Sequence, residues 1–271
     1  MVEDDFSERP MRRKRPDGPS KWLPREEYVV DEVNPNEGLP FARKWRMAVF
    51  GGSFDPVHLG HIRLAREVLE RDLADEVLFV PAKRSPFKAS RQMDSGVVRM
   101  EMLNLALQDA MEEKSTFLGK DPRSGKEVKK VYRFGVSDLE LQREGDYSYT
   151  YDTLATLRRV YPDVELKFLM GTDNLGDLAK WYQAGALLKE FDFIIYPRPG
   201  VAGPSDVELI RTYRAFGAKL ARARLSAEDL PMWELSSTDI RNGVAQGEEF
   251  SEALSPSVWK YIQEHKLYQE A

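Results

Sequence analysis

The 271-residue sequence contains no cysteine. Disulfides, thiolate-bound metals and cysteine nucleophiles are therefore excluded, which fits a reducing compartment. Histidine is also scarce, with three in the whole chain. The pattern His-Glu-x-x-His is absent and the third histidine, His265, lies near the far end of the sequence. A zinc site is therefore not expected.

Long apolar runs are missing as well. No stretch approaches the ~18 residues that cross a bilayer, and charges begin at the third residue, unlike in a secretory signal. The formal net charge is −5, whereas nucleic-acid-binding proteins usually present a basic face. We therefore expect a cytoplasmic protein that binds neither a membrane nor a nucleic acid. The sequence does not define an oligomeric state.

The chain divides into an N-terminal arm and one domain. Residues 1–44 are polar, rich in proline and without periodicity, which predicts a flexible arm. Its basic cluster, residues 12–15, fits a solvated tail, although an address signal or an RNA-binding patch stays open. Residues 45–271 are predicted to form the domain. Within it, the polar, glycine-containing segment 114–130 predicts a surface insertion or hairpin.

Short apolar runs alternate with amphipathic segments along the domain. The runs lie at 47–50, 77–80, 134–136, 166–170 and 191–196, and the helix-like segments at 62–70, 96–112, 151–161 and 175–189. This alternation is typical of a parallel sheet with helices on both faces. The predicted fold class is α/β, a Rossmann-like doubly wound parallel sheet, which binds ligands beyond the carboxyl ends of its strands.

The first apolar run leads into the most informative segment, Gly51-Gly52-Ser53-Phe54-Asp55-Pro56-Val57-His58-Leu59-Gly60-His61. A strand, a glycine turn and a helix start present bare backbone N–H groups and a positive helix end to a phosphate. Neither G-x-G-x-x-G nor the P-loop pattern is present, so this is a different phosphate-binding design. Gly51 and Gly52 also fit a tight turn with positive φ.

Two of the three histidines lie in this segment, three positions apart. His58 and His61 can therefore share one face of a helix turn, and Gly60 leaves room for a phosphate between them. Capping or surface positions are the simpler alternative for both histidines. We interpret them as phosphate-binding side chains.

Further polar motifs follow the other predicted strands and helices. Residues 236–241, Ser-Ser-Thr-Asp-Ile-Arg, predict a helix capped by Ser236, and hydroxyls beside an arginine at a helix start also suit an anion. Asp173, in Gly171-Thr172-Asp173, fits a helix N-cap, as does Thr150. Trp181 with Tyr182 fits either a core pair or a platform for a ligand.

These separated motifs resemble the signature of the HxGH nucleotidyltransferases, and residues from about 47 to 268 are similar to bacterial nicotinate mononucleotide adenylyltransferases. The resemblance implies adenylyl transfer from ATP to nicotinate mononucleotide, giving nicotinate adenine dinucleotide and pyrophosphate in NAD biosynthesis. It implies ATP contacts from Gly51, Gly52, Ser53, Phe54, Gly60, Gly171, Asp173, Arg198, Ser236, Ser237 and Thr238. It implies mononucleotide contacts from Thr150, Trp181 and Tyr182.

The catalytic residues that the resemblance implies are His58, His61, Lys88 and Arg241. We expect them to act as cations on phosphate oxygens, with Mg²⁺ as the cofactor of ATP and no metal ligands from the protein. Bound ATP is expected to raise the pKa of both imidazoles. The family often carries Pro-Pro-His-Lys where this chain has Ser-Pro-Phe-Lys, so Phe87 replaces a histidine.

Two other functions remain open at this stage. A phosphopantetheine adenylyltransferase or another HxGH nucleotidyltransferase would share the phosphate-binding residues. The Ser148-Tyr149-Thr150 motif and Trp181, however, favour a pyridine nucleotide as the acceptor. A non-catalytic nucleotide-binding protein would keep these phosphate-binding residues without catalysing adenylyl transfer. The four intact catalytic candidates argue against that second alternative.

Overall fold

The computed structural model describes residues 44–84, 93–121, 124–145, 147–198, 203–225 and 236–269. Its centre is a five-stranded, wholly parallel sheet with strand order β5-β2-β1-β6-β7. The strands are β1 (Trp45–Gly52), β2 (Glu76–Pro81), β5 (Phe134–Val136), β6 (Val164–Gly171) and β7 (Asp192–Tyr196). Four of them contain one of the five apolar runs, and β7 contains all of the fifth run except Phe191, so the Rossmann-like prediction is confirmed.

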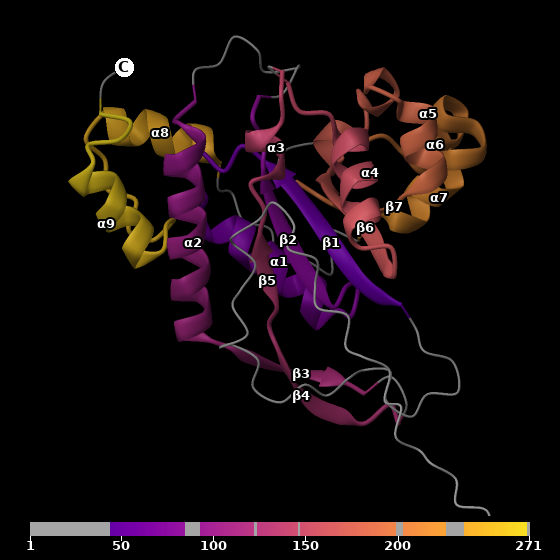
Figure 1. Cartoon of the computed structure of the whole chain (residues 1–271), viewed down its shortest axis with the longest axis horizontal. Coiled ribbons are helices and arrows are strands. Elements are labelled where there is room, and N and C mark those ends of the chain that lie inside the picture. The colour runs from indigo at the N-terminus through magenta and orange to yellow at the C-terminus, as the bar shows by residue number, and fades with distance from the viewer. Residues whose placement is uncertain are drawn as a thin grey trace, which may run out of the picture.

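Helices cover both faces of the sheet (Figure 1). On one side lie α1 (Leu59–Glu70), α2 (Gly96–Glu113), α8 (Ser237–Ala245) and α9 (Pro256–Glu264). On the other side lie α4 (Thr150–Val160), α5 (Ala184–Glu190), α6 (Asp206–Tyr213) and α7 (Gly217–Ala223). The short helix α3 spans Leu139–Gln142, and 3₁₀ turns span Thr172–Asn174, Leu178–Lys180 and Arg214–Phe216.

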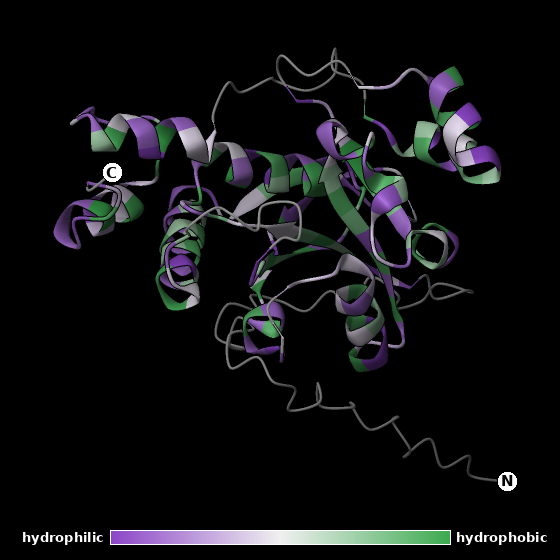
Figure 2. Ribbon diagram, turned by 90° about the horizontal axis from the view of Figure 1, so that it is seen from above, coloured by the Kyte–Doolittle hydropathy of each residue, from purple (hydrophilic) through white to green (hydrophobic). Residues whose placement is uncertain are grey.

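Alternation along the strands explains this double cover. In β1, Ala48 and Phe50 belong to the core under α1, α2, α8 and α9, whereas Met47 and Val49 belong to the opposite core. Successive strand residues point to opposite faces, so a continuous apolar run buries both faces of a strand. Figure 2 shows the apolar residues concentrated on the strands and on the sheet-facing sides of the helices. Each large side chain buried in these cores contributes about 1.5–3 kcal/mol.

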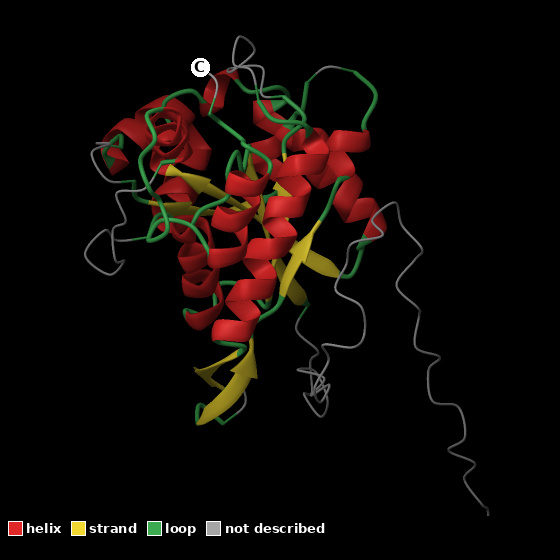
Figure 3. Ribbon diagram, turned by 90° about the vertical axis from the view of Figure 1, so that its left-hand side faces the viewer, coloured by secondary structure: helices red, strands yellow, loops and turns green. Residues whose placement is uncertain are grey.

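The segment 114–130 forms most of an antiparallel hairpin, β3 (Thr116–Lys120) with β4 (Glu127–Val131). The hairpin projects from one end of the domain (Figure 3). Immediately after β4, the buried Tyr132 donates a hydrogen bond to Glu70, at the end of α1. Of the two alternatives predicted for residues 114–130, a surface insertion or a hairpin, the structure therefore shows the hairpin.

The helix predicted over residues 175–189 is wrong. That stretch contains the 3₁₀ turn Leu178–Lys180, an extended Trp181 and a left-handed Gln183 with φ 54°, and only then α5. Burial of Leu175, Leu178 and Leu187 produced the helical spacing. Two glycines, Gly176 and Gly185, weaken a continuous helix there.

The strand order places the carboxyl ends of β1 and β6 side by side at the point where the connections reverse direction. Doubly wound sheets bind their ligands at this point. No described helix has the length and apolarity that crossing a membrane requires. The predicted arm lies outside the described residues, apart from Lys44.

Candidate active site

The loop after β1 has its strained residue at Phe54, with φ 48°, and not at the glycines. Gly51 and Gly52 end the strand instead, so the alternative of a positive-φ turn at these positions is wrong. A Cβ on Gly52 would lie 2.9 Å from the Phe54 ring. Gly52 is therefore required because the buried Phe54 folds back against the backbone.

The two histidines meet at the start of α1, as predicted. His58 is the N-cap residue, and His61 lies one turn on, with ring centroids 3.7 Å apart. The backbone N–H of His58 donates to His61 Nδ1 at 3.1 Å. A neutral imidazole that accepts at Nδ1 carries its proton at Nε2, so His61 is fixed as an Nε2–H donor. The N–H of Leu59 is not bare, because it donates to the Ala253 carbonyl.

Burial keeps both imidazoles uncharged near neutral pH. Desolvation, with a smaller contribution from the charge of Arg198, lowers the pKa of His58 to about 3. Desolvation also lowers the pKa of His61 well below its usual value, helped by His58 and Arg198. Both side chains are therefore neutral donors in the nucleotide-free protein, and their cationic form in the ATP complex stays a prediction.

The helix α8 docks against this loop by its first turn. Ser236 caps the helix by accepting from the Asp239 N–H at 3.1 Å, as predicted. Ser237 Oγ donates to the Pro56 carbonyl at 2.9 Å, and Arg241 donates to the Asp55 carbonyl at 2.5 Å. The positive ends of α1 and α8 thus flank one loop at the carboxyl edge of β1.

Arg241 also fixes the exposed Thr238 at the same helix end. One guanidinium nitrogen donates to the Ser237 carbonyl at 3.0 Å, and the other to Thr238 Oγ1 at 3.2 Å. These three residues, Ser237, Thr238 and Arg241, therefore form one hydrogen-bonded group beside residues 53–58. We call residues 53–58, which lead from β1 to the two histidines, the histidine loop.

The next edge of the site joins β6 to the end of β7. Asp173 pairs with Arg198 at 2.9 Å, so its carboxylate is not the expected helix cap; Gly171 takes the N-cap position of the 3₁₀ turn. A Cβ on Gly171 would lie 2.3 Å from Asp173 Oδ1 and 2.9 Å from Arg198 Cδ. A methyl group at this position would therefore displace both side chains of the ion pair.

The residues proposed for the mononucleotide lie at the start of α4 and before α5. Thr150 is the first helical residue, and Tyr149 takes the cap position that we expected for it. Trp181 packs edge-on against Phe168 in the core, at a centroid distance of 6.0 Å. Tyr182 is 48% exposed, with its ring 4.8 Å from that of Tyr149. The two aromatics thus divide between a partly buried position against the core and a surface position.

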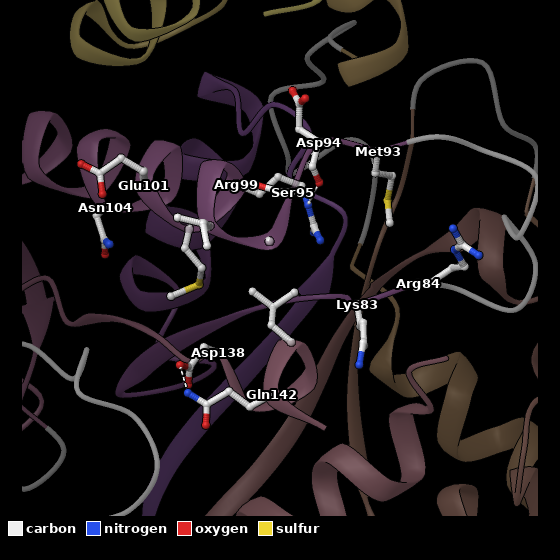
Figure 4. Close-up of a pocket in the computed structure, with 14 residues that line it drawn as sticks. Lys83, Arg84, Met93, Asp94, Ser95, Arg99, Glu101, Asn104, Asp138 and Gln142 are labelled. Atoms are coloured by element: carbon white, nitrogen blue, oxygen red, sulfur yellow. Dashed lines mark hydrogen bonds between the residues drawn. The ribbon is translucent and has the colours of Figure 1, made fainter. Parts of the chain in front are cut away.

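A cavity of about 630 Å³ lies between the segment after β2, the helix α2 and the short helix α3 (Figure 4). Figure 4 shows Lys83 and Arg84, after β2, on one side and Glu101 and Asn104 of α2 on the other. The histidines do not line it. Lys88 and Phe87, which follow Arg84 in sequence, lie outside the described residues.

Sequence reasoning missed the buried residues that hold the loop in place. Arg99 is 2% exposed and donates to the carbonyls of Ser53, at 2.7 Å, and Asp94, at 3.0 Å. Arg99 lies on the buried face of α2 together with Leu103 and Ala106. A charged residue within an apolar helix face was the signal that could have revealed it.

A second missed residue, the carboxylate of Glu140, supports the turn before α4. Glu140 is buried, which raises its pKa, and it accepts a hydrogen bond from Thr153 Oγ1 at 2.6 Å. Ser148 Oγ accepts from the Lys83 N–H at 2.9 Å, and the Ser148 N–H donates to the Arg84 carbonyl at 2.9 Å. This turn is therefore attached to the segment that leads toward Lys88.

The fold and the two convergent helix ends define a nucleotide-binding α/β protein of the nucleotidyltransferase type. The sequence pattern of the Cytidylyltransferase-like family matches residues 49–243. The chain is 35% identical over 226 residues to a protein of Desulfitobacterium hafniense, covering 82% of this chain and 95% of that one. It is 34% identical over 223 residues to one of Exiguobacterium sibiricum, covering 82% and 98%. Both are named "Probable nicotinate-nucleotide adenylyltransferase".

A solved structure shares the fold. The nicotinic acid mononucleotide adenylyltransferase of Plasmodium falciparum complexed with NaAD superposes with a TM-score of 0.60 at 18% identity, covering 84% of this chain and 98% of that one. The chain therefore belongs to the cytidylyltransferase-like family and, within it, to the nicotinate-nucleotide adenylyltransferases.

Proposed function

We propose that the protein transfers the adenylyl group of ATP to nicotinate mononucleotide in NAD biosynthesis, and that it does so at the loop between β1 and α1. The main support for placing the reaction at this loop is that the N-termini of two helices, α1 and α8, converge on residues 53–58. Helix ends of this kind are anion sites, because their N–H groups and dipoles favour negative charge. The absence of cysteine supports a cytoplasmic setting.

In this reaction a phosphate oxygen of the mononucleotide attacks the α-phosphorus of ATP, and the bond from the α-phosphorus to the α,β-bridging oxygen breaks as pyrophosphate leaves. The attacking oxygen is already anionic, so the protein does not have to supply a strong base. Its main tasks are to align two polyanions and to stabilise the charge that grows on the leaving group.

The histidines perform this task as neutral donors that become charged in the complex. His61 offers Nε2–H, and its orientation is fixed by the bond from the His58 backbone. A polyphosphate beside the two buried rings would favour their protonated forms and raise both pKa values. The growing charge of the leaving pyrophosphate would then meet groups that are already in position.

Ser237, Thr238 and Arg241 complete the phosphate cradle from the start of α8. Asp173 and Arg198, at the ends of β6 and β7, suit the adenosine half of ATP. Thr150, Trp181 and Tyr182 suit the mononucleotide, and Lys88 adds a cation to the phosphates. Mg²⁺ enters with ATP as the MgATP substrate, where it neutralises phosphate charge. The described residues contain no cluster of three or more His, Asp or Glu side chains that could hold a metal.

The experiment compares acceptor substrates with the purified full-length protein and MgATP. Nicotinate mononucleotide, nicotinamide mononucleotide and phosphopantetheine are supplied separately, and pyrophosphate and the dinucleotide product are measured. We expect the highest kcat/KM with nicotinate mononucleotide. Faster turnover of phosphopantetheine, or no pyrophosphate with any acceptor, would reject the proposal in favour of a different transferase or a nucleotide-binding protein.

A further inference from the structure

The histidine loop is held by residues from several distant parts of the chain. Arg99 of α2 binds the Ser53 carbonyl, and α8 binds the carbonyls of Asp55 and Pro56. These contacts grip the backbone of the loop. The side chain of Asp55, which is 0% exposed, accepts a hydrogen bond from a residue in the segment after α9.

The residue that reaches Asp55 is Tyr268, 213 positions away in the sequence. Its hydroxyl donates to Asp55 Oδ1 at 3.0 Å, and the Asp94 N–H approaches the same oxygen at 3.4 Å. The Tyr268 ring packs against the core formed with α1 and α2. Burial and the neighbouring carboxylates of Asp55 and Asp94 raise the pKa of this hydroxyl, so it stays protonated and remains a donor.

The backbone between α9 and Tyr268 is strained in a way that serves this contact. Lys266 and Tyr268 both adopt left-handed conformations, with φ of 51° and 62°. Non-glycine residues hold such conformations only where the surrounding contacts enforce them. The first is stabilised by the hydrogen bond from the Leu267 N–H to the Ile262 carbonyl at 3.0 Å, which turns the chain back after the helix. The second brings the phenol to Asp55.

We propose that Tyr268 is a positioning residue for adenylyl transfer, which fixes Asp55 and thereby the histidines three and six residues further on. This inference rests on the proposed role of the histidine loop in phosphate binding. Asp55 begins the short rigid path Asp55-Pro56-Val57-His58, whose members are all buried. A shift of Asp55 is therefore transmitted to the N-cap of α1 and to the hydrogen bond that orients His61.

The test is the variant Tyr268→Phe, which keeps the ring in the core and removes only the hydroxyl. We expect kcat with MgATP and nicotinate mononucleotide to fall about tenfold, with kcat/KM falling by a similar factor, because a misplaced donor acts mainly in the transition state. Tyr132→Phe is the matched control. It removes another tyrosine hydroxyl that donates to a carboxylate, Glu70, at the end of α1 remote from the histidines. Its kcat should stay within twofold of the parent.

A double-mutant cycle separates positioning from a loss of stability. In an Asp55→Ala background, the further change Tyr268→Phe should alter kcat by less than twofold, because the hydroxyl has lost its acceptor on the loop that leads to the histidines and keeps only the Asp94 side chain, which lies outside that loop. Multiplicative losses, or an unchanged kcat in Tyr268→Phe, would overturn the inference. Thermal denaturation of each variant verifies that the assayed fraction is folded.

The histidine variant His61→Ala shows which proposal has failed. If it loses turnover while Tyr268→Phe does not, only the role of Tyr268 is wrong. If His61→Ala retains full turnover, the catalytic role of the loop itself is wrong.

Discussion

The imidazole of His61 is oriented by the backbone of His58, whose N–H donates to Nδ1 at 3.1 Å. The same N-cap geometry brings the two rings to a centroid separation of 3.7 Å, with planes 33° apart. One helix turn therefore fixes the tautomer of one histidine and the distance to the other. Two neutral donors so placed can reach neighbouring oxygens of one phosphate chain and share the charge it brings.

Loss of the oriented donor should be costly for catalysis. Truncation of His61 to Ala is expected to lower turnover by roughly 10²–10³, about 3–4 kcal/mol, the usual cost of removing one preorganised donor. Steady-state pyrophosphate release measures it. His265→Ala is the control, because that exposed histidine follows α9 and packs on Tyr261. Equal activity of the two variants would contradict the assignment.

The buried imidazoles should make stability depend on pH. Their folded-state pKa values are lowered, so the unfolded state binds more protons once the pH falls below about 6.5. Stability should be constant above that pH and decline toward the folded pKa of His58, about 3, by up to about 1.4 kcal/mol per pH unit from this residue. Urea denaturation at pH 7.5, 6.5 and 5.5 measures the slope. A His58→Asn variant with the same slope as the parent would contradict the account.

Nucleotide binding should reverse these shifts. NMR titration of the imidazoles, with and without a non-hydrolysable ATP analogue, is expected to show both pKa values higher in the complex, because phosphate charge favours the imidazolium. The variant Arg198→Gln should raise them in the free protein as well, by less than the nucleotide does, since the Arg198 charge is a minor cause of the lowering. Unchanged pKa values on binding would show that the phosphates do not contact the rings.

The ion pair between Asp173 and Arg198 should depend on Gly171. In Gly171→Ala, the new methyl group would displace the carboxylate, and we expect the KM for ATP to rise about fivefold, close to 1 kcal/mol. Gly176→Ala is the control, since nothing lies within 4 Å of a Cβ there. Its KM should equal that of the parent. A similar KM in all three proteins would remove the ion pair from the nucleotide site.

The two aromatics before α5 should respond differently to truncation. Tyr182→Ala is expected to raise the KM for nicotinate mononucleotide severalfold without a loss of stability, because this side chain is about half exposed. Trp181→Ala should raise the same KM and also destabilise the fold by about 3–5 kcal/mol, because its ring packs against Phe168. Kinetics with the acceptor varied, together with urea denaturation, distinguish the two effects. A normal KM in both variants would place the mononucleotide elsewhere.

The sequence was sufficient to predict the sheet and most helices, because their signal is local. Residues 134–136 were predicted with the bounds that β5 has, and 96–112 became α2 with one more residue. The stretch 175–189 failed because buried leucines at helical spacing can also come from turns. The left-handed backbone at Phe54 could not be foreseen, since glycine is the usual carrier of positive φ and Gly51 and Gly52 lie just before it.

The site was predictable where motifs are contiguous and not where contacts are distant. The histidine pair and the Ser236 cap follow from spacings of three residues. The pairing of Asp173 with Arg198 joins two strand ends, and the contact of Tyr268 with Asp55 joins two ends of the domain. Such contacts depend on packing across the whole fold, so no local pattern signals them. Neutrality of the imidazoles likewise depends on burial, which only the structure provides.

The most direct measurement is a crystal structure of the full-length protein with a non-hydrolysable ATP analogue and Mg²⁺. We expect its phosphate oxygens to lie about 3 Å from His61 Nε2 and from the first turn of α8. A nucleotide whose phosphates bind elsewhere, with the start of α1 left free, would contradict the role of the histidine loop.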